Sequence, residues 1–441
     1  MSEQRKRVAD VGFLVALMLF IVAGIMLVPP HGDEYMQMSM ARDVFYEAQG
    51  EWARLAYVPP VQPDTEPYLR LLNGTLNKTL IGLTWLVTGR TEQDLPGIYA
   101  WGESQEWNIA QGNVPSDEAL ALARWSSALL TALGVIPIFV IGWHVRLRSV
   151  AYPAALLYAL HPVVLINGRR AMMEGSLMLF SLLTVAWAVE MIVTEHSAAA
   201  TGWMRRLSPL ARYVGLGVCG GLVLSAKYTG IAIVATALLA VMITSLARRR
   251  TWRAVLYALL AGTITVVIWF ALNPIFWNDP VGALRASVEA RVDLLNRQST
   301  DPLLAYKTTG ERFSALLTQP FLSPPQYYEA PTWAGVIEAP IAAYENSALR
   351  GWAWTPLIGV VLTALMLYGL LRLVIEVWRR NLVAVAILMW LAVMLITSMS
   401  SPLNWQRYYL PLILVGVVLA ATGIGYLVVW RLPTTERQPT A

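Results

Sequence analysis

The sequence has a single cysteine, Cys219, which lies inside an apolar run. One cysteine forms no internal disulfide and no cysteine-based metal site. Charged residues are also scarce, at 14% of the chain, whereas 56% of the residues are hydrophobic and the mean hydropathy is +0.52. The chain lacks a tandem repeat and a glycine-rich phosphate loop. This composition lies outside the range of soluble domains and indicates a membrane protein.

Apolar runs bounded by charged residues predict an all-α polytopic membrane protein with about ten spanning helices. The least certain boundary lies in 211–247, which is too long for one helix and is divided at Lys227. We expect the spans near 11–28, 122–143, 150–167, 172–194, 211–226, 228–247, 254–272, 354–375, 382–400 and 408–430.

Basic residues gather in the loops on one side of these spans. Because positively charged loops stay in the cytoplasm, both termini are predicted to be cytoplasmic. The formal net charge of +5 is therefore a topology signal and does not indicate a nucleic-acid surface. The clusters are Arg5-Lys6-Arg7, Arg146 with Arg148, Arg205-Arg206, Arg248-Arg249-Arg250 with Arg253, and Arg379-Arg380.

Two long segments, 29–121 and 273–353, are predicted to lie outside the cytoplasm. The first contains two amphipathic stretches, 35–48 and 71–87, which we expect to lie as helices along the membrane surface. Neither segment has the composition of a disordered region, since both carry tryptophans at intervals.

A pair of adjacent carboxylates, Asp33 and Glu34, follows the first predicted span just beyond the membrane boundary. A carboxylate at this place can deprotonate an incoming hydroxyl group. An enzyme that acts outside the cytoplasm cannot count on a nucleotide-activated donor, so a lipid phosphate donor fits better. Cationic side chains would hold its phosphate. Such cations occur in the short outer turns, at Arg169 and Arg170 before Glu174, at Lys227, and at Arg407.

Further motifs follow the acidic pair in order along the chain. They are Ala41-Arg42-Asp43, Arg124-Trp125-Ser126-Ser127-Ala128, Arg169 to Glu174, Ser225 to Gly230, Asn273 to Trp277, and Arg407-Tyr408. Together they resemble protein O-mannosyltransferases and aminoarabinose transferase (ArnT)-like proteins, which are GT-C glycosyltransferases that use polyprenyl-phosphate sugars. The chain departs from the pattern at Gln37, where ArnT-like members carry a tyrosine, and at Glu174, where mannosyltransferases usually have an aspartate.

The resemblance implies one GT-C-type transmembrane domain over residues 1–441 and a transfer that inverts the sugar. Asp33 would be the base, and Glu34 would support it or position the acceptor. The sugar is by default a hexose, and the acceptor is a protein, a lipid or a glycan. Arg169, Arg170, Lys227 and Arg407 would hold the donor phosphate, with Arg42, Glu174 and Trp277 in supporting positions.

Each of these residues also has a structural interpretation. Asp33 is placed to cap a helix, and the arginines suit the membrane interface. No metal is required, although His31 with Asp33 and Glu34 resembles an incomplete divalent-metal site. Two other classes of function stay open. One is a secondary transporter or flippase of a lipid-linked or anionic substrate, and the other is a non-catalytic protein that binds a lipid-linked sugar.

Overall fold

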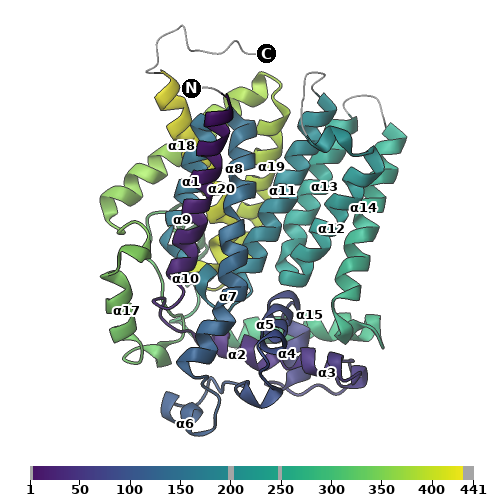
Figure 1. Cartoon of the computed structure of the whole chain (residues 1–441), viewed down its shortest axis with the longest axis vertical. Coiled ribbons are helices and arrows are strands. Elements are labelled where there is room, and N and C mark those ends of the chain that lie inside the picture. Colours follow the sequence, from purple (N-terminus) through teal and green to yellow (C-terminus); the bar gives the residue numbers. More distant parts are fainter. Residues whose placement is uncertain (1–2, 197–202, 247–250, 431–441) are drawn as a thin grey trace.

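The computed structural model describes residues 3–196, 203–246 and 251–430. Within these ranges the chain is helical and has no strand, only an isolated bridge between Ala305 and Leu403. Long helices stand side by side in one bundle, and shorter helices lie across one end of it (Figure 1). The prediction of an all-α polytopic protein is confirmed.

The bundle is formed by twelve of the described helices. They are α1 (Glu3–Ala23), α7 (Asp117–Leu133), α8 (Val135–Arg146), α9 (Arg148–Leu160), α10 (Pro162–Arg169), α11 (Glu174–His196), α12 (Pro209–Ala226), α13 (Ile231–Leu246), α14 (Thr251–Ala271), α18 (Pro356–Trp378), α19 (Leu382–Ser400) and α20 (Leu410–Trp430).

Eight helical stretches in the described part of the chain are long and apolar enough to cross a membrane, with α7 and α8 counted as one. A ninth would be the pair α9 and α10, which bends by 57° at His161-Pro162. We expected about ten. The difference is α1, whose first turns carry Lys6, Arg7 and Asp10, although it packs against α7 and α9 within the bundle. The predicted arginine cluster at 248–250 lies outside the described residues.

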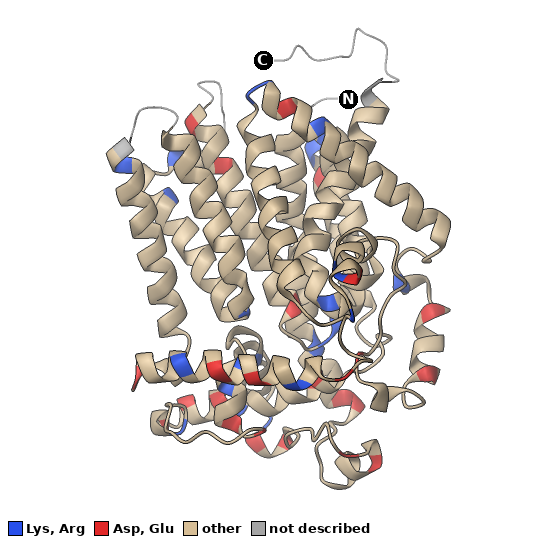
Figure 2. Ribbon diagram, turned by 180° about the vertical axis from the view of Figure 1, so that it is seen from behind, with Lys and Arg blue, Asp and Glu red and all other residues tan. Residues whose placement is uncertain are grey.

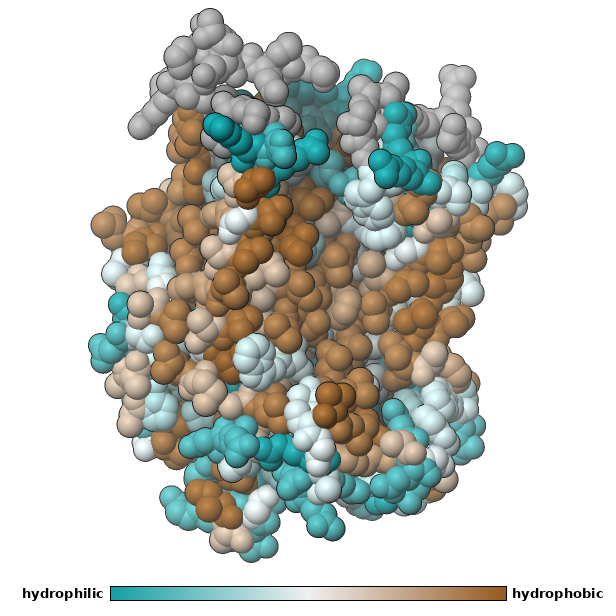
Figure 3. All heavy atoms as spheres, viewed as in Figure 1, coloured by the Kyte–Doolittle hydropathy of each residue, from teal (hydrophilic) through white to brown (hydrophobic). Residues whose placement is uncertain are grey.

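Helix α20 lies at the centre of the bundle, against α8, α9, α11, α18 and α19. Its residues from Leu412 to Leu414 and from Val417 to Ala421 are buried. Close approach to α18 requires Gly369, because a Cβ atom there would overlap the carbonyl oxygen of Leu419. On the face seen in Figure 3, hydrophobic side chains form a broad band, and hydrophilic side chains gather toward the two ends of the molecule. This is the surface expected of a chain that spans a bilayer.

The bundle end opposite the start of α1 carries the short helices, and we call it the loop end (Figure 1). Helix α15 lies there across the direction of the bundle (Figure 2). The helices in the two long segments are α2 (Gly32–Met40), α3 (Asp43–Ala48), α4 (Glu66–Leu72), α5 (Leu76–Val87), α6 (Gln105–Ala110), α15 (Pro280–Ser299), α16 (Thr309–Thr318) and α17 (Glu338–Glu345).

The 3-10 turns complete the described elements. They are η1 (Trp52–Arg54), η2 (Glu92–Asp94), η3 (Trp203–Arg206), η4 (Tyr228–Gly230), η5 (Pro274–Phe276), η6 (Pro331–Trp333), η7 (Ala348–Arg350) and η8 (Gln406–Tyr409). An apolar cluster joins the two long segments at the loop end, because Trp333 of the second packs among Tyr35, Trp85 and Tyr99 of the first. This contact holds the start of α2 against the second segment.

Candidate functional site

The acidic pair occupies the first turn of α2, and His31 caps that helix. The Nδ1 atom of His31 accepts a hydrogen bond from the backbone N–H of Asp33 at 3.1 Å, and Glu34 Oε2 accepts from the backbone N–H of His31 at 3.0 Å. This reciprocal capping satisfies N–H groups that a helix start leaves unpaired. Asp33 is therefore not the cap itself, and its carboxylate is directed elsewhere.

Glu34 is fully buried, and both of its carboxylate oxygens are hydrogen-bonded. Arg124 of α7 donates to them from Nε at 2.7 Å and from Nη2 at 2.9 Å, and the N–H of Ala171 donates at 2.8 Å. Burial opposes ionisation of this carboxyl, but the charge and hydrogen bonds of Arg124, the charge of Arg170 and the N–H of Ala171 together outweigh it and lower the pKa of Glu34. Glu34 thus joins α2, α7 and the turn before α11.

Asp33 is different, because about a third (32%) of its side chain is exposed. Its Oδ2 accepts a hydrogen bond from Nη1 of Arg407, a residue of η8 that is far away in the sequence. Arg407 also forms an ion pair with Glu329, with 3.1 Å between Nε and Oε1, and Glu329 Oε2 lies 2.6 Å from His31 Nε2. We call these four residues the Asp33 cluster.

The electrostatics of the Asp33 cluster favour the ionised carboxylates. Burial raises the pKa of the Asp33 carboxyl, but the charge and hydrogen bond of Arg407 and the influence of His31 together lower it by more, so the net shift is downward. The same two opposing causes act on Glu329, and its pKa is also lowered. Because His31 Nδ1 accepts a hydrogen bond, its Nε2 donates to Glu329. The cluster therefore presents one accessible carboxylate held by a buried cation.

Three cations surround the ring of Tyr408, the residue after Arg407. Lys227 Nζ lies 5.1 Å from the ring centre, Arg291 Cζ of α15 at 5.8 Å and Arg407 Cζ at 5.7 Å. Lys227 also donates to Glu174 Oε1 at 3.0 Å. Three cations that are far apart in the sequence are thus gathered around Tyr408, the residue next to Asp33's partner Arg407.

The adjacent arginines Arg169 and Arg170 have separate environments, and both are buried. Arg169 donates to the carbonyl oxygens of Phe20 and Ile21 near the end of α1, at 2.9 and 2.7 Å. In the second segment it donates to the carbonyl oxygen of Leu349 and to the hydroxyl of Tyr344. Arg170 donates to the carbonyl of Pro29 at 3.0 Å and to that of Tyr327 at 2.7 Å. These guanidinium groups bind backbone, a geometry that gives no support to a role in phosphate binding.

The supporting residues Arg42 and Trp277 lie away from the Asp33 cluster. Arg42 donates to the carbonyl of Pro96 at 3.1 Å and pairs with Glu66. Trp277 stacks on Trp52, with 5.4 Å between ring centres. The third predicted supporting residue, Glu174, is the partner of Lys227.

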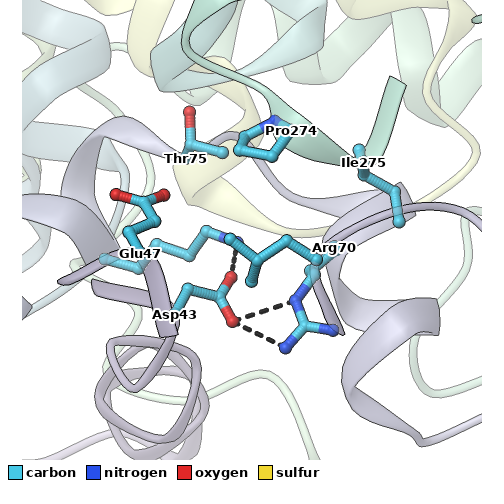
Figure 4. A pocket seen from close by; sticks show the side chains of 8 residues that line it. Asp43, Glu47, Arg70, Thr75, Pro274 and Ile275 are labelled. Carbon is cyan, nitrogen blue, oxygen red and sulfur yellow. Dashed lines mark hydrogen bonds and ion pairs between the residues drawn. The ribbon is translucent and has the colours of Figure 1, made fainter. Parts of the chain in front are cut away.

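A second buried charge cluster is formed by Asp43, Arg70 and Lys78, and Figure 4 shows Asp43 with Arg70. Asp43 Oδ1 accepts from Arg70 at 2.9 and 2.7 Å, and Oδ2 accepts from Lys78 Nζ at 2.6 Å. They line a small pocket with Glu47, Thr75, Pro274 and Ile275. Burial lowers the pKa of Lys78 despite the charge of Asp43. Sequence analysis did not identify Arg70, Lys78, Arg291 or Glu329, and it named Arg124 only as part of a motif, with no role of its own.

The three residues considered for a metal, His31, Asp33 and Glu34, do not converge as ligands. Both ring nitrogens of His31 and both oxygens of Glu34 already have hydrogen-bond partners. In the part of the chain that the structure describes, no group of three or more His, Cys, Asp or Glu residues could hold a metal ion. The residues at this place do not fit a metal site.

Residues 95–277 match the family model of dolichyl-phosphate-mannose-protein mannosyltransferase. No match was found among curated proteins. Among solved structures, the chain is similar to the oligosaccharyltransferase of Archaeoglobus fulgidus in the apo form, with a TM-score of 0.54 and 16% identity over 95% of this chain and 50% of that chain. It is also similar to ArnT from Cupriavidus metallidurans bound to undecaprenyl phosphate, with a TM-score of 0.53 and 14% identity over 96% of this chain and 60% of that one.

The chain has the fold of GT-C membrane glycosyltransferases. The predicted resemblance to O-mannosyltransferases and to ArnT is confirmed. The chain spans about half the length of the oligosaccharyltransferase and 60% of that of ArnT. The matched segment 95–277 contains Arg124, Glu174 and Lys227 but neither Asp33 nor Arg407, so the family match does not itself identify the Asp33 cluster.

Proposed function

We propose that this protein is a glycosyltransferase that moves a sugar, by default a hexose, from a polyprenyl-phosphate donor to an acceptor hydroxyl group. The single observation that carries the proposal is the partly exposed carboxylate of Asp33, held by the buried Arg407 at the loop end of a GT-C fold. The similar ArnT structure contains undecaprenyl phosphate, which supports a donor of this class.

In the proposed reaction, Asp33 accepts the proton of the acceptor hydroxyl. The acceptor oxygen forms a bond to the anomeric carbon on the face opposite the phosphate. The bond from that carbon to the phosphate oxygen breaks, and polyprenyl phosphate leaves with the electron pair. One displacement inverts the anomeric centre, and no covalent enzyme intermediate forms. The pairing with Arg407 keeps Asp33 ionised at neutral pH and fixes its orientation.

The leaving phosphate gains negative charge, and the cations around Tyr408 are placed to stabilise it. We assign this role to Lys227, Arg407 and Arg291, the last of which replaces Arg169 and Arg170 in the predicted set. A phosphate that shares the Arg407 guanidinium weakens its hold on Asp33, which makes Asp33 a stronger base when the donor is bound. Glu34 positions α2 and does not react.

The proposed orientation places the loop end outside the cytoplasm. The loop between α8 and α9 carries Arg146 and Arg148, and that between α18 and α19 carries Arg379 and Arg380. Both loops lie at the bundle end where α1 begins (Figures 1 and 2). Basic loops favour the cytoplasmic side, so the Asp33 cluster faces the opposite side.

The test is turnover by the purified protein in liposomes with a panel of polyprenyl-phosphate hexoses and pentoses. Release of polyprenyl phosphate is measured with a mixture of peptide, lipid and glycan acceptors. Release from at least one donor supports the proposal and identifies the sugar. Protein that is folded, binds these donors and releases polyprenyl phosphate from none of them contradicts it and favours a transporter or a binding protein.

A further inference from the structure

A polar hollow of about 290 Å³ lies between α16 and the segment before η8. Its lining includes the hydroxyl groups of Tyr306, Ser314 and Thr318, the amides of Gln319 and Asn404, and the carboxylate of Glu311. We call it the Gln319 groove. Its volume is close to the lower limit of about 300 Å³ typical of small-molecule sites, so it suits a short segment of a ligand.

One buried polar atom of the groove, the amide oxygen of Gln319, has no hydrogen-bond donor among the described residues. The side chain of Gln319 is 8% exposed, and its Nε2 donates to Asn404 Oδ1 at 3.2 Å and to Tyr306 Oη at 3.4 Å. Its Oε1 atom is buried and has no hydrogen-bond partner among the described residues. A buried amide oxygen without a donor is unfavourable, and a hydroxyl group of a bound ligand would satisfy it.

The groove is joined to the Asp33 cluster by two chain segments that run together. Gln319 bonds to Asn404, and Gln326 and Gln406 each donate a backbone N–H to the other's side chain at 2.8 Å. The next link is the ion pair of Glu329 with Arg407. Asn404 and Arg407 are three positions apart in the sequence, so their Cα atoms are at most about 11 Å apart. The groove therefore lies close to the Asp33 cluster.

The chemistry of the lining selects among ligands. Neither lysine nor arginine is among the residues that line the groove, which disfavours a phosphate or another anion. Ala315 is its only aliphatic lining residue, which disfavours a lipid chain. Hydroxyls, amides and one carboxylate instead offer donors and acceptors at close spacing, as a polyhydroxylated ligand requires.

We propose that the Gln319 groove binds a neutral carbohydrate and that the acceptor of the transferred sugar is a glycan. The identification of this carbohydrate as the acceptor rests on the proposed glycosyltransferase activity. The binding of a carbohydrate in the groove does not depend on that activity. The groove holds the sugar units behind the reacting one, and the reacting hydroxyl reaches Asp33. Glu311 is placed to accept hydrogen bonds from the sugar hydroxyls.

The experiment measures binding of mannotriose, maltotriose and a Ser/Thr-rich peptide to the full chain in nanodiscs, without donor, by saturation-transfer NMR and titration. The variants are Gln319→Leu, which removes the unpaired amide oxygen, and Ser314→Trp, which fills the groove. Leu317→Trp is the matched control, because it lies on the same helix at an exposed position that does not line the groove.

We expect at least one trisaccharide to bind the wild type and Leu317→Trp alike. Ser314→Trp and Gln319→Leu should each weaken that binding at least tenfold. If neither trisaccharide binds, or if the groove variants bind as the wild type does, the proposal is overturned. Competitive binding of the peptide at the same groove also overturns it and points to a protein acceptor. Because no donor is present, none of these results depends on the proposed transferase activity.

Discussion

The ion pair of Glu34 and Arg124 allows a quantitative prediction. Both side chains are buried, and Glu34 accepts four hydrogen bonds, two of them from Arg124. In Glu34→Gln, the amide group keeps a carbonyl oxygen that can accept from Ala171. Its NH₂ group, however, faces an N–H donor whose hydrogen bond the carboxylate oxygen accepted. The variant also leaves the Arg124 charge buried without its partner. Loss of one partner of a buried pair costs about 3–5 kcal/mol of folding free energy.

The prediction can be separated from a catalytic effect by a double-mutant cycle. The free energy of unfolding is measured at equilibrium, in mild detergent at neutral pH, for Glu34→Gln, Arg124→Gln and the double variant. We expect each single variant to lose about 3–5 kcal/mol and the double variant to lose less than the sum of both. If Glu34→Gln is destabilised by less than about 1 kcal/mol and yet has no transferase activity, Glu34 takes part in the chemistry and our assignment is wrong.

Three further predictions concern other residues. Arg169→Met removes four hydrogen bonds to buried backbone and tyrosine oxygens and should lower the free energy of unfolding by several kcal/mol in the same assay. A variant as stable as the wild type would contradict the structural role of Arg169. Arg291→Gln should raise KM for the donor about tenfold at unchanged stability, and an unchanged KM would remove Arg291 from the phosphate site. Because the pKa of Asp33 is lowered from 3.8, the acid limb of kcat/KM should lie below pH 3.8, and a limb near pH 6 would exclude Asp33 as the titrating base.

Glu329 adds a pH-dependent contribution to stability of known sign. Its pKa is lowered from 4.5 in the folded state, so the carboxylate stabilises the fold fully above about pH 4.5. This contribution is lost as the pH falls through the lower, folded-state pKa. Between pH 6 and pH 3, the free energy of unfolding should therefore fall by more in the wild type than in Glu329→Gln. Equal losses would contradict the pairing of Glu329 with Arg407.

The class of protein and most helix positions could be predicted because the bilayer constrains the sequence strongly. The predicted span 382–400 coincides with α19, Leu382–Ser400, and 211–226 differs from α12, Pro209–Ala226, by two residues. Apolar length and flanking charge determine these boundaries. The boundaries of the first span were harder to predict, because the charged residues in the first turns of α1 hide the start of this helix, which packs as part of the bundle.

The contacts of the site could not be predicted, since they join residues far apart in the sequence. Asp33 and Arg407 were both identified, but nothing in their motifs indicated that they pair. Glu329 lies in an aperiodic, proline-rich loop, and its sequence context gives no sign of a role. In the structure Trp333 packs this loop against α2, which brings Glu329 to Arg407. Arg169 and Arg170 are neighbours with the same chemistry, and their different partners follow from the direction in which α10 ends. Such directions depend on tertiary packing.

The central claim is that Asp33 is the base of a sugar transfer. Its most direct test is kcat/KM for Asp33→Asn with the donor that the panel identifies, against Asp64→Asn as control. Asp64 is also in the first long segment, is exposed, and has a positive φ that asparagine adopts readily. We predict that Asp33→Asn loses about 10²–10⁴-fold in kcat/KM while Asp64→Asn retains wild-type activity. Transfer by folded Asp33→Asn within threefold of the wild-type rate would contradict the account.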